Sequence, residues 1–415
     1  MDAETVGEEL NSFSGGEKIT TIRRILFLVE SPFNQRDFQR YGIELLLENG
    51  FDVEVWDLIN ILNPHYTKSY MPPDPIDWPG SRILSDKKVA LEKIRDLASD
   101  TFVINFVGYS PKSFWVYRAI SSSQAGYAVH MSNALPSLEM GRNESLFSFY
   151  LKRLSKITGK KLFNLMKSLA RDRFYRLPFS WRGMKPASLI LAGGEQCLKY
   201  PCPVDKSTEI LWAHTMDYDL YLKERDNPCS ERPIAVFLDD YLPFHPDWIR
   251  SGTQPPATAE SYYPLLSNFF NLLEQRLELK VVIAAHPRSH YEELPDYFGG
   301  RECIRGKTIR LVRESRLVLS HASTALSFAN LFHKPVIFLT SSDLDKGSYG
   351  ALIRAMANWF GKNPIWLDGD IAIDWGQELT VDMSHYERYR RAYIKTEQSE
   401  DIPFWQIVAN RLRKG

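Results

Sequence analysis

Carboxylate, imidazole and hydroxyl side chains follow three short apolar runs in the second half of the chain. The three groups are Asp239-Asp240 after residues 234–238, His286-Pro287-Arg288 after residues 280–285, and His321-Ala322-Ser323-Thr324 after residues 317–320. Such runs are typical of buried strands in a parallel sheet, and ligands bind outside the carboxyl ends of those strands. The sequence therefore predicts that these side chains gather at one sheet edge, around a ligand.

Imidazole, guanidinium and hydroxyl groups are donors suited to a phosphate or a carboxylate. Proline stops the second run, which leaves its histidine and arginine at the sheet edge; the alternative is an ordinary loop histidine and a surface arginine. A Ser or Thr after the third run is predicted to cap a helix, whose start can bind phosphate, although such caps are common. The predicted phosphate-binding residues are His286, Arg288, His321, Ser323 and Thr324.

Asp239 and Asp240 are the candidate catalytic residues. Neighbouring residues at a strand end point in opposite directions, so we expect one of the two carboxylates to face the ligand. A carboxylate there could act as a nucleophile or a general base, and the alternative is an acid that merely caps a turn. A metal ion is not expected, because no second acidic cluster supplies converging oxygen ligands.

Charged residues in the first half could form the opposite wall of a cleft. They follow predicted strands over residues 25–29 and 188–192, and they are Glu30, Arg36, Asp37, Arg40 and Glu195. Gly193 and Gly194 precede the last of them and would let the backbone approach a ligand closely. His214, His245 and His290 have no distinguishing context.

Apolar runs alternate with helical segments in both halves, which predicts an α/β fold with two Rossmann-like domains facing a central cleft. Further strands are predicted over residues 51–56, 102–107, 127–131, 335–339 and 365–367, and helices over 37–48, 260–277 and 322–332. The predicted order is a flexible tail (1–20), a first domain (21–216), a linker (217–231), a second domain (232–384) and a C-terminal segment (385–415).

Composition excludes several classes of protein. The chain has 415 residues, with 51 Lys and Arg balancing 51 Asp and Glu, so a general nucleic-acid binder is not expected. Four cysteines in so long a chain favour a reducing compartment. Neither a secretory signal nor a membrane-spanning segment is found in the sequence, so we expect a cytoplasmic protein.

One segment is strongly basic. Residues 151–185 contain eleven Lys and Arg and one acid, Asp172, with apolar residues at near-helical spacing. This pattern predicts a basic helical insertion in the first domain that could contact an anionic membrane surface or a lipid-linked acceptor. The alternative is a solvated helix whose apolar stripe packs on its own domain.

The three motifs resemble those of GT-B glycosyltransferases that use CMP-activated ulosonic acids. Bacterial sialyltransferases of this type carry an acidic, a His-Pro and a Ser-Ser/Thr motif in this order, although Tyr241 stands where they have Gly. The run Leu242-Pro243-Phe244-His245-Pro246, and the segments Leu28–Phe33 and Arg36–Phe38, look more like retaining β-Kdo transferases and the related pseudaminic acid transferases. The resemblance covers most of residues 22–410.

This resemblance implies a CMP-sugar donor and a glycan or lipid-linked glycan acceptor of lipopolysaccharide or capsule. His286, Arg288 and the Ser323-Thr324 pair would hold the CMP phosphate, without metal or cofactor. Asp239 would be the nucleophile of a retaining reaction, with Asp240 in reserve, or the base of an inverting one. The C-terminal helices would cross back to the first domain. The alternatives are a GT-B enzyme that uses a UDP-sugar or CDP-glycerol, and a non-catalytic glycan-binding protein.

Overall fold

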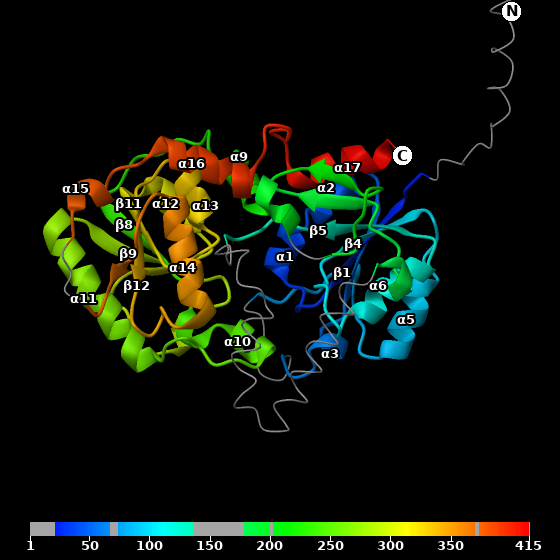
Figure 1. The fold of residues 1–415 in the computed structure, drawn as a ribbon, viewed down its shortest axis with the longest axis horizontal. Coiled ribbons are helices and arrows are strands. Elements are labelled where there is room, and N and C mark those ends of the chain that lie inside the picture. The colour runs from blue at the N-terminus through cyan, green and yellow to red at the C-terminus, as the bar shows by residue number, and fades with distance from the viewer. Residues whose placement is uncertain (1–20, 67–73, 137–177, 200–201, 370–372, 415) are drawn as a thin grey trace, which may run out of the picture.

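The computed structural model describes residues 21–66, 74–136, 178–199, 202–369 and 373–414. The predicted tail and most of the basic segment, residues 151–177, lie outside the described residues. Within the described part, the chain forms two α/β bodies side by side, and residues from both ends of the chain build the first of them (Figure 1).

The first domain is built on a seven-stranded parallel sheet with strand order β3-β2-β1-β4-β5-β6-β7 among the described residues. The strands are β1 (Arg24–Val29), β2 (Asp52–Asp57), β3 (Ser81–Ile83), β4 (Thr101–Asn105), β5 (Gly126–His130), β6 (Leu189–Ala192) and β7 (Glu209–Trp212). Its helices are α1 (Gln35–Arg40), α2 (Ile43–Glu48), α3 (Ile59–Leu62), α5 (Lys87–Arg95) and α6 (Phe114–Ser122), with 3₁₀ turns at Ser180–Arg182 and Glu195–Lys199.

Alternate side chains of this sheet enter two separate hydrophobic clusters, one on each face. Leu26 and Leu28 of β1 face a cluster that contains residues of α5 and α6. Ile25 and Phe27 face the other cluster, which contains residues of α2 and of the C-terminal helix α17 (Phe404–Arg413). The C-terminal helix therefore supplies part of the core of the first domain.

The second domain repeats this strand order. Its six-stranded sheet runs β10-β9-β8-β11-β12-β13, which is the Rossmann order 3-2-1-4-5-6 in a second copy. The strands are β8 (Ile234–Leu238), β9 (Lys280–Ala285), β10 (Cys303–Arg305), β11 (Leu317–Ser320), β12 (Val336–Thr340) and β13 (Ile365–Trp366). The helices are α10 (Pro246–Ser251), α11 (Ala259–Leu277), α12 (Thr308–Glu314), α13 (Leu326–Leu331), α14 (Gly347–Trp359), α15 (Trp375–Glu378) and α16 (Met383–Tyr389), with 3₁₀ turns at Leu242–Phe244 and Tyr291–Glu293.

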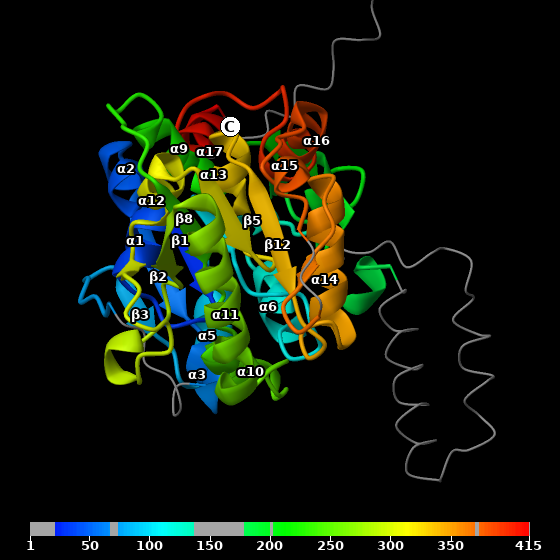
Figure 2. The same ribbon diagram turned by 90° about the vertical axis from the view of Figure 1, so that its left-hand side faces the viewer.

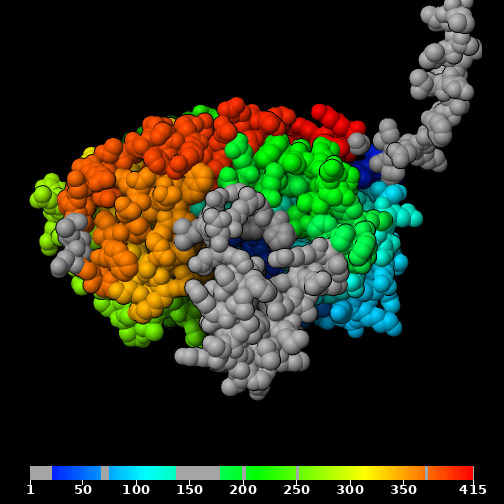
Figure 3. Space-filling view, viewed as in Figure 1, coloured from blue at the N-terminus to red at the C-terminus, as the bar shows by residue number. Residues whose placement is uncertain are grey.

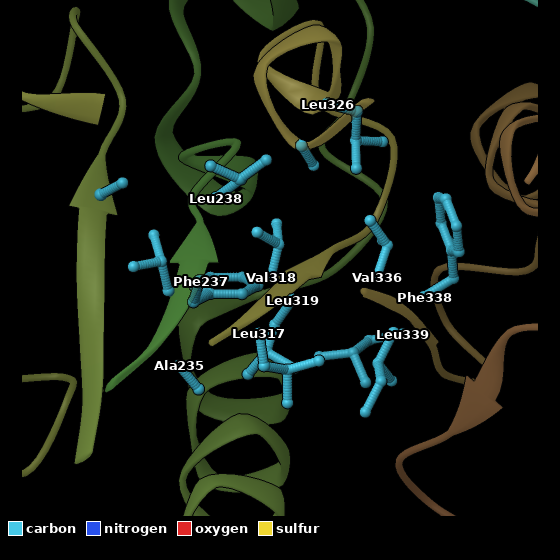
Figure 4. Packing of buried hydrophobic residues seen from close by; sticks show 14 of the residues in the cluster. Ala235, Phe237, Leu238, Leu317, Val318, Leu319, Leu326, Val336, Phe338 and Leu339 are labelled. Carbon is cyan, nitrogen blue, oxygen red and sulfur yellow. The ribbon is translucent and has the colours of Figure 1, made fainter. Parts of the chain in front are cut away.

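The central strands of the second sheet are buried along their whole length. Leu319 of β11 is in register with Phe237 of β8, and apolar side chains of β12 continue the packing across the sheet (Figure 4). Burial on both faces explains why these strands read as continuous apolar runs. It also fixes the strand ends, and with them the residues that follow.

The two domains are joined twice, at neighbouring positions. Helix α9 (Met216–Glu224) spans the junction, because Met216 packs in the first domain's core and Tyr218 in the second domain's core. The predicted linker thus begins as a helix. The chain returns through α16, a π-helical segment (Arg390–Ile394) and α17, which extend over the tops of both bodies (Figures 1–3). The predicted crossing of the C-terminal helices is confirmed.

Trp405 anchors this return. Its side chain is fully buried, and its Nε1–H donates a hydrogen bond to the carbonyl oxygen of Arg40 at 2.8 Å. Gly42 has a φ of +55°, and a Cβ there would lie 2.4 Å from Cδ1 of Trp405. The glycine splits the predicted helix 37–48 into α1 and α2 and leaves room for the indole.

The structure confirms two Rossmann-like domains with a cleft between them and a C-terminal helix that crosses back, which is the GT-B arrangement. Among the described residues, none of the helices combines the length and the apolar character needed to span a membrane.

We expect Trp405→Ala to lower the free energy of unfolding by about 3–5 kcal/mol, the usual range for deleting a buried aromatic side chain. Trp181→Ala, in the same domain, is the control, because that side chain is 77% exposed and its loss should change stability by less than about 0.5 kcal/mol. Urea unfolding followed by circular dichroism measures both. Equal effects of the two substitutions would contradict the role given to Trp405.

Candidate functional site

A cavity of about 1080 Å³ lies between the two domains. Helix α1 of the first domain lines one side, and the loops that follow β8, β9 and β11 line the other. We call this space the central cavity. Its polar and charged lining residues include Arg36, Asp240, His245, His286, Ser323 and Thr324. The predicted gathering of three strand ends at one edge of the second sheet is therefore present.

Asp239 is the buried member of the acidic pair. Its Oδ1 accepts the backbone N–H of Tyr241 at 2.9 Å, and its Oδ2 accepts the backbone N–H of His286 at 3.2 Å. Tyr241 has a φ of +52°, so the first of these bonds holds a turn that a non-glycine residue adopts at a cost. Burial raises the pKa of Asp239 to about 7. This carboxylate thus connects the loops after β8 and β9.

Asp240 is half-buried and lines the central cavity. One of its oxygens, Oδ2, accepts the hydroxyl of Tyr349 from α14 at 2.8 Å and the backbone N–H of Ala322 at 3.3 Å. The second bond ties the end of β8 to the end of β11, the point where the strand order of the sheet reverses. Both aspartates belong to the cavity lining, but Asp240 is the more exposed of the two.

Two imidazoles, His286 and His245, lie in contact in the cavity wall. Their ring centroids are 4.7 Å apart at an interplanar angle of 67°. In each His-Pro motif Nδ1 accepts the backbone N–H two residues on, that of Arg288 at 3.1 Å and that of Asp247 at 3.2 Å. A neutral ring that accepts at Nδ1 carries its proton on Nε2. In His286, which lines the central cavity, the donor is therefore Nε2–H.

The charge state of His286 follows from its surroundings. Burial, and then the neighbouring His245, hold the pKa of His286 well below its usual range. The ring is therefore neutral at pH 7 and can bind an anion by hydrogen bonding rather than by net charge.

The two His-Pro motifs are also joined by an ion pair. Nη1 of Arg288 lies 3.2 Å from Oδ1 of Asp247. Arg288, predicted to bind phosphate, therefore contacts the neighbouring loop. This pair fixes the spacing of the loops that carry the two imidazoles.

The third strand end differs from its prediction. Ser323 and Thr324 line the cavity, but the residue that caps α13 is Ala325, and no side chain caps this helix. His321 is fully buried behind the site, where its ring contacts the Tyr262 hydroxyl at 2.9 Å and the Leu339 carbonyl at 2.7 Å. The predicted Ser or Thr cap is wrong, because the helix begins after Ala325. The prediction that His321 contacts a ligand is also wrong, because the ring is buried and both of its nitrogens already have partners within the protein.

On the opposite wall, Arg36 and Arg40 of α1 line the cavity. Arg40 lies 3.3 Å from Asp217 of α9, so its charge has a partner. Burial raises the pKa of Asp37, which is not among the lining residues. Glu30 is also absent from the lining; its carboxylate lies near Gly108, after β4.

Glu195 lies outside the central cavity as well. It pairs with Arg391 of the C-terminal segment at 2.7 Å, in a second hollow at the junction of the domains. A Cβ on Gly194 would lie 2.2 Å from the carbonyl oxygen of Ala392, and one on Gly193 would lie 2.5 Å from that of Ser132. The two glycines therefore make room for the backbone of this chain, and the predicted close approach of a ligand is wrong.

His245 and Tyr349 are the cavity residues that sequence reasoning missed. The sequence did contain a signal for His245, because His245-Pro246 and His286-Pro287 are two copies of one dipeptide, each a few residues after a buried strand. Nothing in the local sequence distinguishes Tyr349. In the described part of the chain no group of three or more His, Cys, Asp or Glu side chains could hold a metal ion.

Neither a protein-family model nor a curated protein sequence matches the chain. Among solved structures, the wall teichoic acid polymerase TagF aligns with a TM-score of 0.49 and 10% identity, over 96% of this chain and 89% of that chain. The S. aureus MnaA–UDP co-structure has a TM-score of 0.45 and 13% identity over 93% and 95% of the two chains. MurG from Acinetobacter baumannii has a TM-score of 0.41 and 10% identity over 95% and 100%. These similarities concern the fold alone.

The raised pKa of Asp239 predicts a pH dependence of stability. Between the ordinary value of 3.8 and about 7 the folded protein holds a proton that the unfolded chain has lost, so this group's contribution falls as pH rises and levels off above about 7. We therefore expect the stability of the wild type relative to Asp239→Asn to be lower at pH 8 than at pH 5.

Urea unfolding at the two pH values measures this difference. Asp343→Asn is the control, because a hydrogen bond from Lys346 lowers the pKa of Asp343 and keeps it ionised in both states across this range. A wild-type and Asp239→Asn difference that does not change with pH would contradict the assignment.

Proposed function

We propose that this protein is a glycosyltransferase that moves a Kdo-like or nonulosonic acid from its CMP-activated form onto a bacterial surface glycan. The observation that carries the proposal is the convergence of Asp240, the imidazoles of His245 and His286 and the Ser323-Thr324 pair on one cavity between two Rossmann-like domains. The order of these motifs along the chain supports the choice of donor, because it matches that of transferases for CMP-activated ulosonic acids.

In this proposal the CMP phosphate lies against the second domain. The Nε2–H groups of His245 and His286 donate to its oxygens, and the hydroxyls of Ser323 and Thr324 lie on the same wall. A CMP-sugar has one phosphodiester with a single negative charge, which a few neutral donors can satisfy as the sugar departs. We propose that no metal ion or other cofactor is needed.

Asp240 is our proposed catalytic carboxylate, and Asp239 positions the loops around it. Both aspartates are among the cavity-lining residues, but Asp239 is buried with both oxygens accepting backbone N–H bonds, whereas the hydrogen bonds of the half-buried Asp240 use only Oδ2. In a retaining reaction an oxygen of Asp240 attacks the anomeric carbon as the bond to the phosphate breaks, and the acceptor hydroxyl then displaces the aspartate. In an inverting reaction Asp240 removes the proton from the acceptor hydroxyl instead.

The acceptor would enter from the first domain, whose helix α1 faces the donor wall (Figure 1). We propose a growing lipopolysaccharide or capsule glycan as acceptor, free or lipid-linked, and a cytoplasmic protein that contacts the inner membrane peripherally. The basic segment proposed for that contact lies mostly outside the described residues.

A panel of donors tests the proposal. Purified protein is incubated with CMP-Kdo generated in situ, a CMP-nonulosonate, a UDP-sugar and CDP-glycerol, and release of the nucleotide is followed with and without acceptor glycan. We expect release from a CMP-ulosonate. Release of nucleotide only from the UDP-sugar or from CDP-glycerol would refute a CMP-ulosonate donor and identify another one. Binding of glycan without release of nucleotide from any donor would indicate a non-catalytic protein.

Asp240→Asn should reduce the rate of CMP release by about 10²–10⁴-fold, the usual contribution of a catalytic acid or base, while leaving CMP binding within twofold. Asp226→Asn provides the matched control, since its side chain is 85% exposed and is not among the residues that line the cavity. Unchanged turnover in Asp240→Asn would refute the catalytic assignment. The anomeric configuration of the product, read by NMR, separates retention from inversion.

A further inference from the structure

Arg36 is a charged residue of the cavity wall that makes no salt bridge with any residue that the structure describes. Arg40 pairs with Asp217 and Arg288 with Asp247, but among the described residues Arg36 makes neither a salt bridge nor a hydrogen bond, and the carboxylates of Asp37 and Asp217 act on it without direct contact. Its side chain is half-buried in the wall of the central cavity. Holding a guanidinium away from water without a counter-ion is costly, and proteins rarely do so without a reason.

The electrostatic surroundings make this position more favourable still for an anion. Burial and then the neighbouring Arg40 lower the pKa of Arg36. The carboxylates of Asp37 and Asp217 partly oppose this, and Arg288 from the opposite domain adds to the lowering. Arg36 in turn lowers the pKa of His286, so its charge acts across the cleft on the proposed phosphate-binding wall. An anion bound between the two walls would relieve this repulsion.

We propose that Arg36 binds the carboxylate of the donor sugar acid and thereby selects ulosonic acids over uncharged sugars. The inference rests on the proposed function. In a CMP-ulosonate the anomeric carbon bears both the phosphate oxygen and the carboxylate, so one carbon atom separates the two anions. With the phosphate against His245 and His286, the carboxylate can turn to the opposite wall, where Arg36 offers a planar pair of N–H donors that fits it.

The test follows the release of CMP from CMP-Kdo, which is generated in situ, in the absence of acceptor. The inhibition constant of added CMP is measured in the same assay, because CMP is the product and competes with the donor. We expect Arg36→Gln to raise KM for CMP-Kdo by about tenfold or more, as for loss of a charged hydrogen bond, and to leave the inhibition constant of CMP within about twofold. Arg36→Lys keeps the positive charge but lacks the planar pair of N–H donors, so its KM for CMP-Kdo should lie between those of the wild type and Arg36→Gln. Arg95→Gln on the exposed face of α5 should match the wild type.

Three results would overturn the proposal. If Arg36→Gln weakens the binding of CMP-Kdo and of CMP equally, Arg36 contacts the phosphate and not the carboxylate. If its KM for CMP-Kdo without acceptor is unchanged, Arg36 does not bind the donor, and the anion that it binds belongs to the acceptor. A clear fall in the melting temperature of ligand-free Arg36→Gln would indicate a structural role, since removing an unpaired cation should leave stability unchanged or raise it. A wild type that neither releases CMP nor binds it would instead refute the proposed function.

Discussion

A single buried carboxylate connects the two loops that carry the imidazoles. Asp239 accepts one backbone N–H from Tyr241 and another from His286, so the turn after β8 and the loop after β9 keep a fixed relation. The first domain repeats this solution, because Asp57 at the end of β2 accepts the N–H of Ile59 at 2.7 Å, and burial raises its pKa to about 7. In both sheets a buried strand-end aspartate accepts backbone N–H groups of the loop that follows its strand.

The opposite wall depends on the far end of the chain. The indole of Trp405 donates to the carbonyl oxygen at the end of α1, the helix that presents Arg36 to the cavity. The same C-terminal segment packs on Gly194 and contributes to the core of the first domain. The geometry of the cleft is therefore set by two chain crossings at the junction of the domains, and a change in either one would move the walls relative to each other.

Much of the fold can be predicted from the sequence because its central strands are buried on both faces. The strands over residues 234–238, 280–285 and 317–320 have the predicted bounds. The edge strands β3, β7 and β10 were not predicted, because they are short and partly exposed and therefore lack a continuous apolar run. The residues of the site are harder to predict than the strands. His321 and Gly193-Gly194 occur in plausible motifs, yet they have structural roles that depend on their surroundings in the folded chain. Conversely, His245 gains its place from a loop that folds against His286.

In the proposed function, the neighbouring imidazoles of His245 and His286 bind the phosphate of a cytidine nucleotide. A crystal structure of the protein with CMP tests it most directly. We expect phosphate oxygens within hydrogen-bond distance of Nε2 of both rings, with the cytidine against the second domain. A nucleotide bound elsewhere, or a phosphate that touches neither ring, would contradict it.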